Sequence, residues 1–288
     1  PNDPDAWGIS LDPVHPADRA AVRVVGDAAL PEPLLAITRV GDNEFERLPF
    51  TVSRPVPVLV RALGESAGKE NIYADHGWIE RQEDFEPVWE MGDAESQPAG
   101  GASKNREVLA LVRLTPGAYA LCYVTDDSHS FEDWNAESPR EPNAWGITLA
   151  AMDREGAEAL RRGEAKGGPK VISLAPVGDD SDLVHRFRLT ETVRFRLIAM
   201  GEGNDDPLAD RGWLEDAKTG RKIWQMRYRD TEPAGGASKN RIVRADLALP
   251  SGEYELHYET DGSHAFGSRN SAPPRQPNLW GVTLIEQR

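Results

Sequence analysis

The nonapeptide PAGGASKNR occurs twice in this chain, at Pro98–Arg106 and, letter for letter, at Pro233–Arg241. Further residues recur around it at the same spacing: Gly77-Trp78 with Gly212-Trp213, Trp89 with Trp224, and Asp126, Ser128 and His129 with Asp261, Ser263 and His264. Each copy is much longer than the roughly 20 to 50 residues of a solenoid repeat, so each can bury a core of its own. The chain is therefore interpreted as two tandem copies of one domain.

Strand patterns dominate each copy. Apolar residues alternate with others in Val56–Val60 and Tyr119–Tyr123, and again in Val193–Leu197 and Tyr254–Tyr258. The 26 glycines and 22 prolines are typical of short strands joined by turns. We count seven or eight strands per copy, which predicts an all-β protein of two tandem homologous β-sandwiches, Ig-like or jelly-roll-like in type.

A helix-permissive segment precedes the strands of each copy, at Pro16–Gly26 and at Asp153–Gly163. We therefore expect each sandwich to begin with a short helix. This interpretation places the first domain at residues 12–152 and the second at residues 153–288.

Residues 1–11 are left over, and they resemble the closing strand of a domain. The Trp-Gly pair at Trp7 matches those at Trp145 and Trp280, which end the two copies. One interpretation is the remnant of a preceding repeat. The other is a donor strand, with Trp7, Ile9 and Leu11 as its assembly residues, that extends the sheet of a neighbouring chain.

The overall charge and composition exclude several classes of protein. The formal net charge is −15, so a phosphate backbone would be repelled and we expect no nucleic-acid partner. No apolar run approaches the roughly 18 residues of a membrane span. The single cysteine, Cys122, can form no disulfide within the chain, and its counterpart in the second copy is His257.

The repeated glycine-rich loop carries basic residues in both copies: Lys104, Arg106, Lys239 and Arg241. Backbone N–H groups freed by the paired glycines, together with these charges, could hold an anion. The alternative is a tight structural loop in which Lys104 or Arg106 pairs with a carboxylate such as Asp126 or Asp75. A nucleotide-binding loop needs a second glycine before the lysine and a following helix, and both are missing.

The segment around Ser128 suggests either catalysis or calcium binding. Neighbouring residues on a strand point to opposite faces, so Ser128 cannot pass a proton directly to His129, and a hydrolase ranks third. Asp126 and Asp127 offer the hard oxygen ligands that Ca²⁺ prefers, although Gly262 replaces Asp127 in the second copy. A structural hydrogen-bond network is the further alternative.

An unrepeated tryptophan suggests a binding surface. Trp134 lies in a Pro-rich, acidic loop, and Arg269 takes its place in the second copy, whereas the repeated Trp78, Trp89 and Trp145 suggest core packing. A loop tryptophan can stack on a sugar ring or on a partner chain. The candidate ligand-binding residues are Asp126, His129, Trp134, Asn135, Asp261, His264 and Asn270.

The strand ending in Gly64-Glu65 and the pattern from Leu114 to Asp126 resemble β-sandwich modules repeated in bacterial secreted proteins, nearest to pre-peptidase C-terminal-type domains. The resemblance implies an extracellular accessory or adhesive module without catalysis. The glycine-rich loop and the Ser-His pair are not part of that family's pattern.

These observations lead to one expected function and its rivals. We expect a non-catalytic structural or interaction protein, extracellular or on a cell surface, that needs no cofactor and whose partners are other copies of itself or neighbouring repeats. Self-assembly would involve the strand at residues 1–11. The main alternative is a module that binds carbohydrate or Ca²⁺, with glycans as partners.

Overall fold

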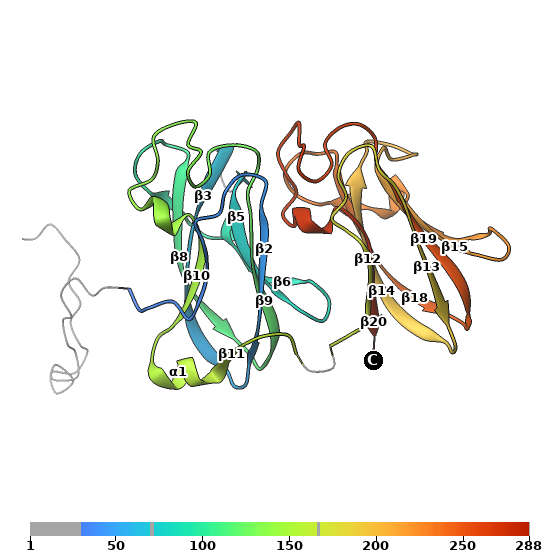
Figure 1. Ribbon diagram of the computed structural model, residues 1–288, viewed down its shortest axis with the longest axis horizontal. Coiled ribbons are helices and arrows are strands. Elements are labelled where there is room, and N and C mark those ends of the chain that lie inside the picture. The colour runs from blue at the N-terminus through green and yellow to red at the C-terminus, as the bar shows by residue number, and fades with distance from the viewer. Residues whose placement is uncertain (1–29, 70–71, 166–167, 288) are drawn as a thin grey trace, which may run out of the picture. The chain divides into compact units, whose positions relative to one another are not determined.

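The described part of the chain consists of two antiparallel β-sandwiches in sequence, which confirms the all-β tandem fold (Figure 1). The computed structural model describes residues 30–69, 72–165 and 168–287. Residues 33–288 form one compact unit. The expected assembly strand at residues 1–11 and the expected helix at Pro16–Gly26 lie outside the described residues.

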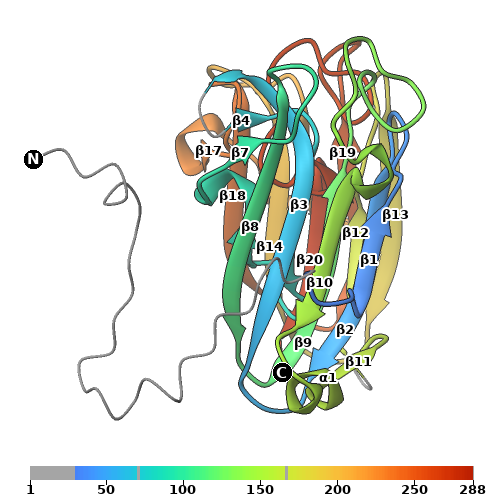
Figure 2. The ribbon, with the colours of Figure 1, turned by 90° about the vertical axis from the view of Figure 1, so that its left-hand side faces the viewer.

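Two sheets make up the first sandwich (Figure 2). The six-stranded sheet has the order β1-β10-β3-β8-β7, with β4 paired to β3. Its strands are β1 (Leu35–Thr38), β10 (Gly146–Ala151), β3 (Val56–Lys69), β8 (Asn105–Leu114), β7 (Gln97–Pro98) and β4 (Ile72–Tyr73). The five-stranded sheet contains, in order, β11 (Leu160–Arg162), β2 (Phe45–Val52), β9 (Gly117–Val124), β5 (His76–Arg81) and β6 (Pro87–Glu90).

The second sandwich repeats this plan with one strand fewer in each sheet. Its five-stranded sheet contains, in order, β12 (Val171–Leu174), β20 (Gly281–Gln287), β14 (Val193–Glu202), β18 (Asn240–Leu249) and β17 (Glu232–Pro233). Its four-stranded sheet contains, in order, β13 (Asp182–Leu189), β19 (Gly252–Glu259), β15 (Arg211–Asp216) and β16 (Lys222–Gln225). Apart from the neighbours β3-β4, β5-β6 and β7-β8, and β15-β16 and β17-β18 in the second sandwich, successive strands alternate between the two sheets.

The alternation in the sequence places the core between the two sheets. Tyr119, Leu121 and Tyr123 of β9 are almost fully buried, as their spacing predicts, and they face apolar residues of β3 across the sandwich. The second sandwich has an equivalent core, which includes Tyr254 and Leu256 of β19. Short 3₁₀ turns shape the loops: η3 (Met91–Asp93), η4 (Pro142–Ala144), η5 (Tyr228–Asp230) and η6 (Pro277–Leu279).

The helix expected at the start of the second domain forms, but it belongs to the first sandwich. Helix α1 (Arg154–Ala159) is capped by Asp153, whose Oδ1 accepts the Gly156 amide at 2.6 Å. It packs against β10 and β3, and the following β11 pairs with β2. Contacts thus place residues 154–162 with the first sandwich, whereas the sequence alone assigns them to the second domain, because helix propensity does not reveal which core the helix covers.

Candidate functional site

The repeated histidines hold the glycine-rich loops in place. His129 is fully buried, and its Nε2 lies 2.6 Å from Oδ1 of Asn105. The Asn105 amide group donates at 2.9 Å to the carbonyls of Gly100 and Glu137, so its Oδ1 must accept and the histidine must donate. This arrangement places a proton on Nε2, and burial, followed by the charge of Lys104, lowers the pKa of His129.

The second sandwich has the same arrangement. Nε2 of the fully buried His264 lies 2.7 Å from Oδ1 of Asn240, and the Asn240 amide group donates to Gly235 and Ala272. Burial lowers the pKa of His264 to about 4. Both histidines therefore stay uncharged at neutral pH and tie two loops together.

A buried carboxylate joins the closing tryptophan to the segment before each histidine. Asp75 is fully buried and accepts the indole N–H of Trp145 and the backbone N–H of Asp126, both at 2.9 Å. Asp210 does the same for Trp280, at 2.8 Å, and for Asp261, at 2.9 Å. Asp126 and Asp261 each accept the N–H of the serine two residues later at 3.0 Å, so these side chains cap turns.

The basic residues of the loops have internal partners in both copies. Lys104 pairs with Glu65 at 2.9 Å and donates to Asn135. Arg106 donates to the hydroxyl and the carbonyl of Ser96. In the second copy Lys239 bonds Glu202 and Asn270, and Arg241 bonds Thr231. These contacts are of the kind that the structural interpretation expects, but the carboxylate partner is Glu65 in the first copy and Glu202 in the second, not Asp126 or Asp75.

Three carboxyl groups converge in the first sandwich. One ligand oxygen from each of Glu65, Asp75 and Asp126 lies within 4.8 Å of the others. Oε2 of Glu65 is buried without a hydrogen-bond partner, and Glu65 is only 8% exposed. Burial raises the pKa of all three groups, and the charge of Asp126 raises the pKa of Glu65 and Asp75 further.

This trio could hold a cation through hard oxygen ligands. Asp127, expected as a ligand beside Asp126, is exposed and outside the trio. Among the described residues one other group of this kind occurs, formed by Glu215, Glu255 and His257 on the second sandwich. The counterparts Glu202, Asp210 and Asp261 do not approach one another this closely, although Oε2 of Glu202 is also buried without a partner.

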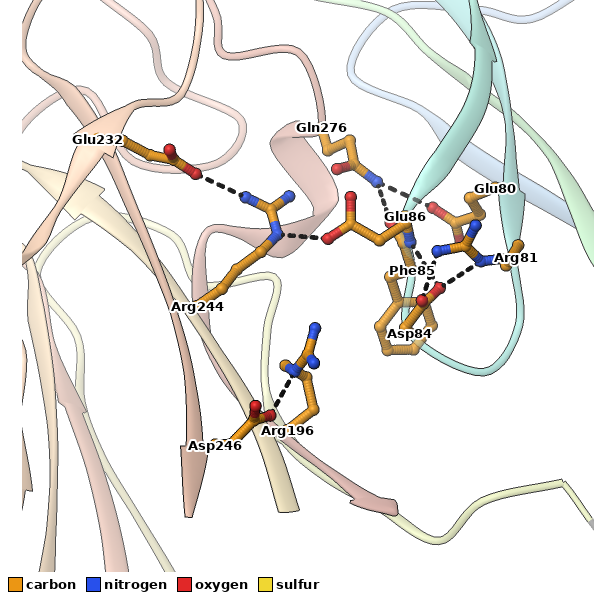
Figure 3. Close-up of polar contacts among 10 residues, drawn as sticks. All are labelled: Glu80, Arg81, Asp84, Phe85, Glu86, Arg196, Glu232, Arg244, Asp246 and Gln276. Carbon is orange, nitrogen blue, oxygen red and sulfur yellow. Dashed lines mark hydrogen bonds and ion pairs between the residues drawn. The ribbon is translucent and has the colours of Figure 1, made fainter. Parts of the chain in front are cut away.

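The outer face of the first sandwich contacts the second sandwich (Figure 3). Gln276 donates through Nε2 to Glu80, at 3.2 Å, and to the carbonyl of Phe85, at 2.8 Å. Arg244 forms an ion pair of 2.9 Å with Glu86. Glu80 is fully buried, and it also accepts hydrogen bonds from Trp78 and Arg47.

The repeated tryptophans Trp78 and Trp213 do not share a core role, contrary to expectation. Trp78 lies on the outer face of β5, where it is fully buried in a small cluster with Cys122 that includes Phe266 of the second sandwich. Trp213 lies at the same place on β15, stacked on His257 at 4.7 Å with Lys222 over its ring. It borders a surface hollow of about 520 Å³.

The loop tryptophan expected to bind a ligand packs within its own sandwich. Trp134 is half-buried and meets Trp145 edge to face at 5.0 Å and His129 at 5.1 Å. Arg269, its counterpart, lies over the rings of Phe266 and Trp280. The first sandwich thus brings Asp126, His129 and Trp134 into one loop cluster, and the second has a cation in place of the aromatic ring.

Comparisons with known proteins leave the family open. No family model matches the chain, and no curated protein matches it. The chain is similar in structure to the CUB1-EGF-CUB2 domain of human MASP-1/3, with 10% identity over 87% of this chain and 96% of the other and a TM-score of 0.24. It is also similar to the N-terminal CBM22-1-CBM22-2 tandem domain of Xyn10C from Paenibacillus barcinonensis, with 12% identity over 82% and 80% and a TM-score of 0.17.

Sequence reasoning missed the residues that join the sandwiches and the full acidic trio. Glu80 and Gln276 belong to no sequence motif. The sequence of β9 does contain a signal for the junction, because its outer face is apolar: Ala118, Ala120, Cys122 and Val124. The counterparts on β19 are polar or charged: Glu253, Glu255, His257 and Glu259. A strand that is apolar on both faces is one whose sheet is covered on both sides.

Proposed function

We propose that this chain is a non-catalytic structural and interaction segment of an extracellular or cell-surface protein. The observation that carries the proposal is the use of the repeated polar side chains. In both copies the aspartate, lysine, asparagine, arginine and histidine that recur around the glycine-rich loop bond to groups of their own sandwich. A role in holding the loops in place is enough to explain why the same residues recur in both copies.

The direct contact between the two sandwiches supports an interaction role. It combines a buried apolar cluster around Trp78 with the buried Glu80–Gln276 hydrogen bond and the Arg244–Glu86 ion pair. Such a contact suits a chain whose partners are neighbouring repeats or further copies of itself. Among the described residues no helix is long and apolar enough to span a bilayer.

A thermal-shift screen against a glycan panel tests the proposal, because a ligand that prefers the native state raises the apparent melting temperature. We expect no glycan to raise it, and we expect Trp134→Ala to lower it through lost packing against Trp145. A glycan that raises the melting temperature of the wild type but not of Trp134→Ala would show that the loop cluster is a sugar site and overturn the proposal.

A second candidate function is Ca²⁺ binding by Glu65, Asp75 and Asp126. The unpartnered Oε2 of Glu65 and the mutual repulsion of the three carboxyl groups favour it. Ca²⁺ should raise the melting temperature and a chelator should reverse the rise. Asp126→Asn should remove the response, whereas Asp261→Asn, the matched change in the second sandwich, should preserve it. A response that survives Asp126→Asn would exclude this site.

A further inference from the structure

In the first sandwich, a segment that follows the closing strand covers the edge of β2. Strand β11 pairs with β2 so that Leu160 lies opposite Val52. The Ser53 amide donates to the carbonyl of Ala159 at 3.0 Å, and the Gly163 amide donates to the carbonyl of Pro49 at 2.8 Å. These two bonds show that the odd-numbered residues of β2 direct their backbone groups toward β11. Helix α1 and β11 together close this edge.

The equivalent edge of the second sandwich is uncovered. Strand β13 corresponds to β2 and ends its sheet, pairing among the described residues with β19 alone. The apolar residues beside the edge are more exposed than their counterparts. Phe187, Leu189 and Val193 are only partly buried, whereas the counterparts Phe50, Val52 and Val56 are 0%, 4% and 2% exposed.

The backbone of β13 has the same polarity as that of β2. Thr260 donates to the carbonyl of Ser181, so the odd-numbered residues of this segment bond to β19. The even-numbered residues, including Arg186 and Arg188, therefore direct their N–H and C=O groups toward the open edge. An edge of this kind accepts an added strand.

The chain itself contains a second version of the segment that covers β2. When Trp7 is aligned with Trp145, Ala21-Val22-Arg23 falls on Ala159-Leu160-Arg161 without a gap. Ala159 and Leu160 are the buried residues at this contact. Pro16 falls on Arg154, the first residue of α1, a position that proline favours. Residues 16–26 therefore match the covering segment at Ala159 and Leu160, the residues next to β2, whereas Asp18 falls on the buried Gly156 of α1.

We propose that residues 16–26 of a second copy of this chain bind the open edge of β13, with Val22 opposite Leu189 and Val24 opposite Phe187. The pairing repeats the register of Leu160–Val52 and Arg162–Phe50. This inference rests on the proposed interaction function and identifies its partner as another copy. Because donor and acceptor are different surfaces, the contact is head-to-tail and adds copies in sequence.

Two proline variants of the full-length chain test the acceptor edge. Arg188 corresponds to Thr51, whose backbone pairs with Arg161, so Arg188→Pro removes an edge-facing N–H that the added strand needs. Arg186 corresponds to Pro49, where a proline already occupies the covered edge, so Arg186→Pro is the matched control. Sedimentation equilibrium should show concentration-dependent association of the wild type and of Arg186→Pro, with association of Arg188→Pro weakened about tenfold or more.

A donor variant completes the test. Val22→Asp should also prevent association, because it places a charge beside Leu189. When Val22→Asp and Arg188→Pro are mixed, one still has the acceptor and the other the donor, so the mixture should form a one-to-one heterodimer. The proposal is overturned if the wild type stays monomeric up to about 1 mM, if both proline variants behave alike, or if the mixture fails to dimerise. None of these outcomes depends on glycan or Ca²⁺ binding, so failure here is distinguishable from failure of the proposed function.

Discussion

The side-chain amide of Gln276 in the second sandwich donates to the carboxylate of Glu80 in the first, and no part of Glu80 is exposed to solvent. Burial raises the pKa of Glu80 above its usual value, and hydrogen bonds from Trp78, Arg47 and Gln276, with the charge of Arg47, offset only part of the rise. A carboxylate placed in a domain interface needs such donors, because an unpaired buried charge is costly. The junction between the sandwiches therefore depends on a small set of polar contacts.

Replacement of Gln276 by leucine should weaken this junction. The change removes the donor to Glu80 and the donor to the Phe85 carbonyl, so we expect a loss of about 1–3 kcal/mol in the free energy of unfolding. Urea denaturation measures it. Gln97→Leu is the control, because its amide bonds Glu107 at an exposed site and its loss should change little. Equal losses in the two variants would contradict the role of the junction.

The stability of the protein should depend on the ionisation of Asp210. Burial raises the pKa of Asp210 to about 7, whereas an aspartate in an unfolded chain has a pKa of about 3.9. At a pH between these two pKa values, the Asp210 carboxyl group is protonated in the folded state and ionised in the unfolded state. The contribution of Asp210 is thus fully present below pH ~4 and is lost as pH rises to about 7, at a slope of at most about 1.4 kcal/mol per pH unit.

Asp210→Asn removes this titration, so its free energy of unfolding should fall less steeply than that of the wild type between pH ~4 and ~7. Denaturation series at each pH provide the comparison. Asp216→Asn is the control, because hydrogen bonds from Thr219 lower the pKa of Asp216 and its titration falls below this window. An unchanged slope in Asp210→Asn would show that Asp210 is ionised throughout.

The paired glycines of the repeated loop should tolerate no side chain. Gly236 has a φ of +65°, and a Cβ there would lie 1.8 Å from the Pro273 carbonyl oxygen. Gly220 has a φ of +66° with no atom within 4 Å of such a Cβ. Gly220→Ala should therefore cost about 1 kcal/mol, from backbone strain alone. Gly236→Ala should cost at least about 3 kcal/mol, because the loop must also move. Similar melting temperatures for the two variants would contradict this steric argument.

The single cysteine should report on the junction. Cys122 is fully buried beside Trp78 and Phe266, and burial raises the pKa of its thiol well above the usual value. Its thiol should resist a disulfide reagent in the native protein, because the reactive thiolate is both rare and inaccessible. Gln276→Leu should increase the labelling rate, whereas Gln97→Leu should leave it unchanged. Fast labelling of the wild type would indicate that the two sandwiches separate readily.

The sequence predicts the sandwich class, the duplication and most strands because alternation and repetition are local properties. It misses β2 and β13 as strands. The outward-facing residues of these two strands are polar or packed against other parts of the protein, and Pro49 interrupts β2. The alternation of apolar and polar residues in the sequence is therefore weak. It also assigns α1 to the wrong sandwich, because the pattern of a short helix shows which face is apolar but not which core receives it.

The candidate site is predicted only in part. The recurrence of Asp126, His129 and Lys104 leads the sequence analysis to consider a structural network beside ligand binding, and the contacts of these residues match in the two copies. Glu65 is not recognised as part of an acidic trio, because its approach to Asp75 and Asp126 is set by tertiary packing. Trp78 and Trp213 occupy equivalent positions in the two copies but have different surroundings. In the sequence, this difference shows only in the adjacent strand, which has alanines in β9 and glutamates in β19.

The contact between the sandwiches joins unlike surfaces: a sheet face around Trp78 meets the loops around Phe266 and Gln276. A two-fold symmetric contact uses the same surface on both partners, so it joins two domains and leaves no surface for a third. This one has a direction, so a gene that gained another copy could extend the protein while leaving every earlier contact as it was. The outer face of β19 cannot repeat this contact unchanged, because Glu253, Glu255, His257 and Glu259 replace the apolar residues of β9.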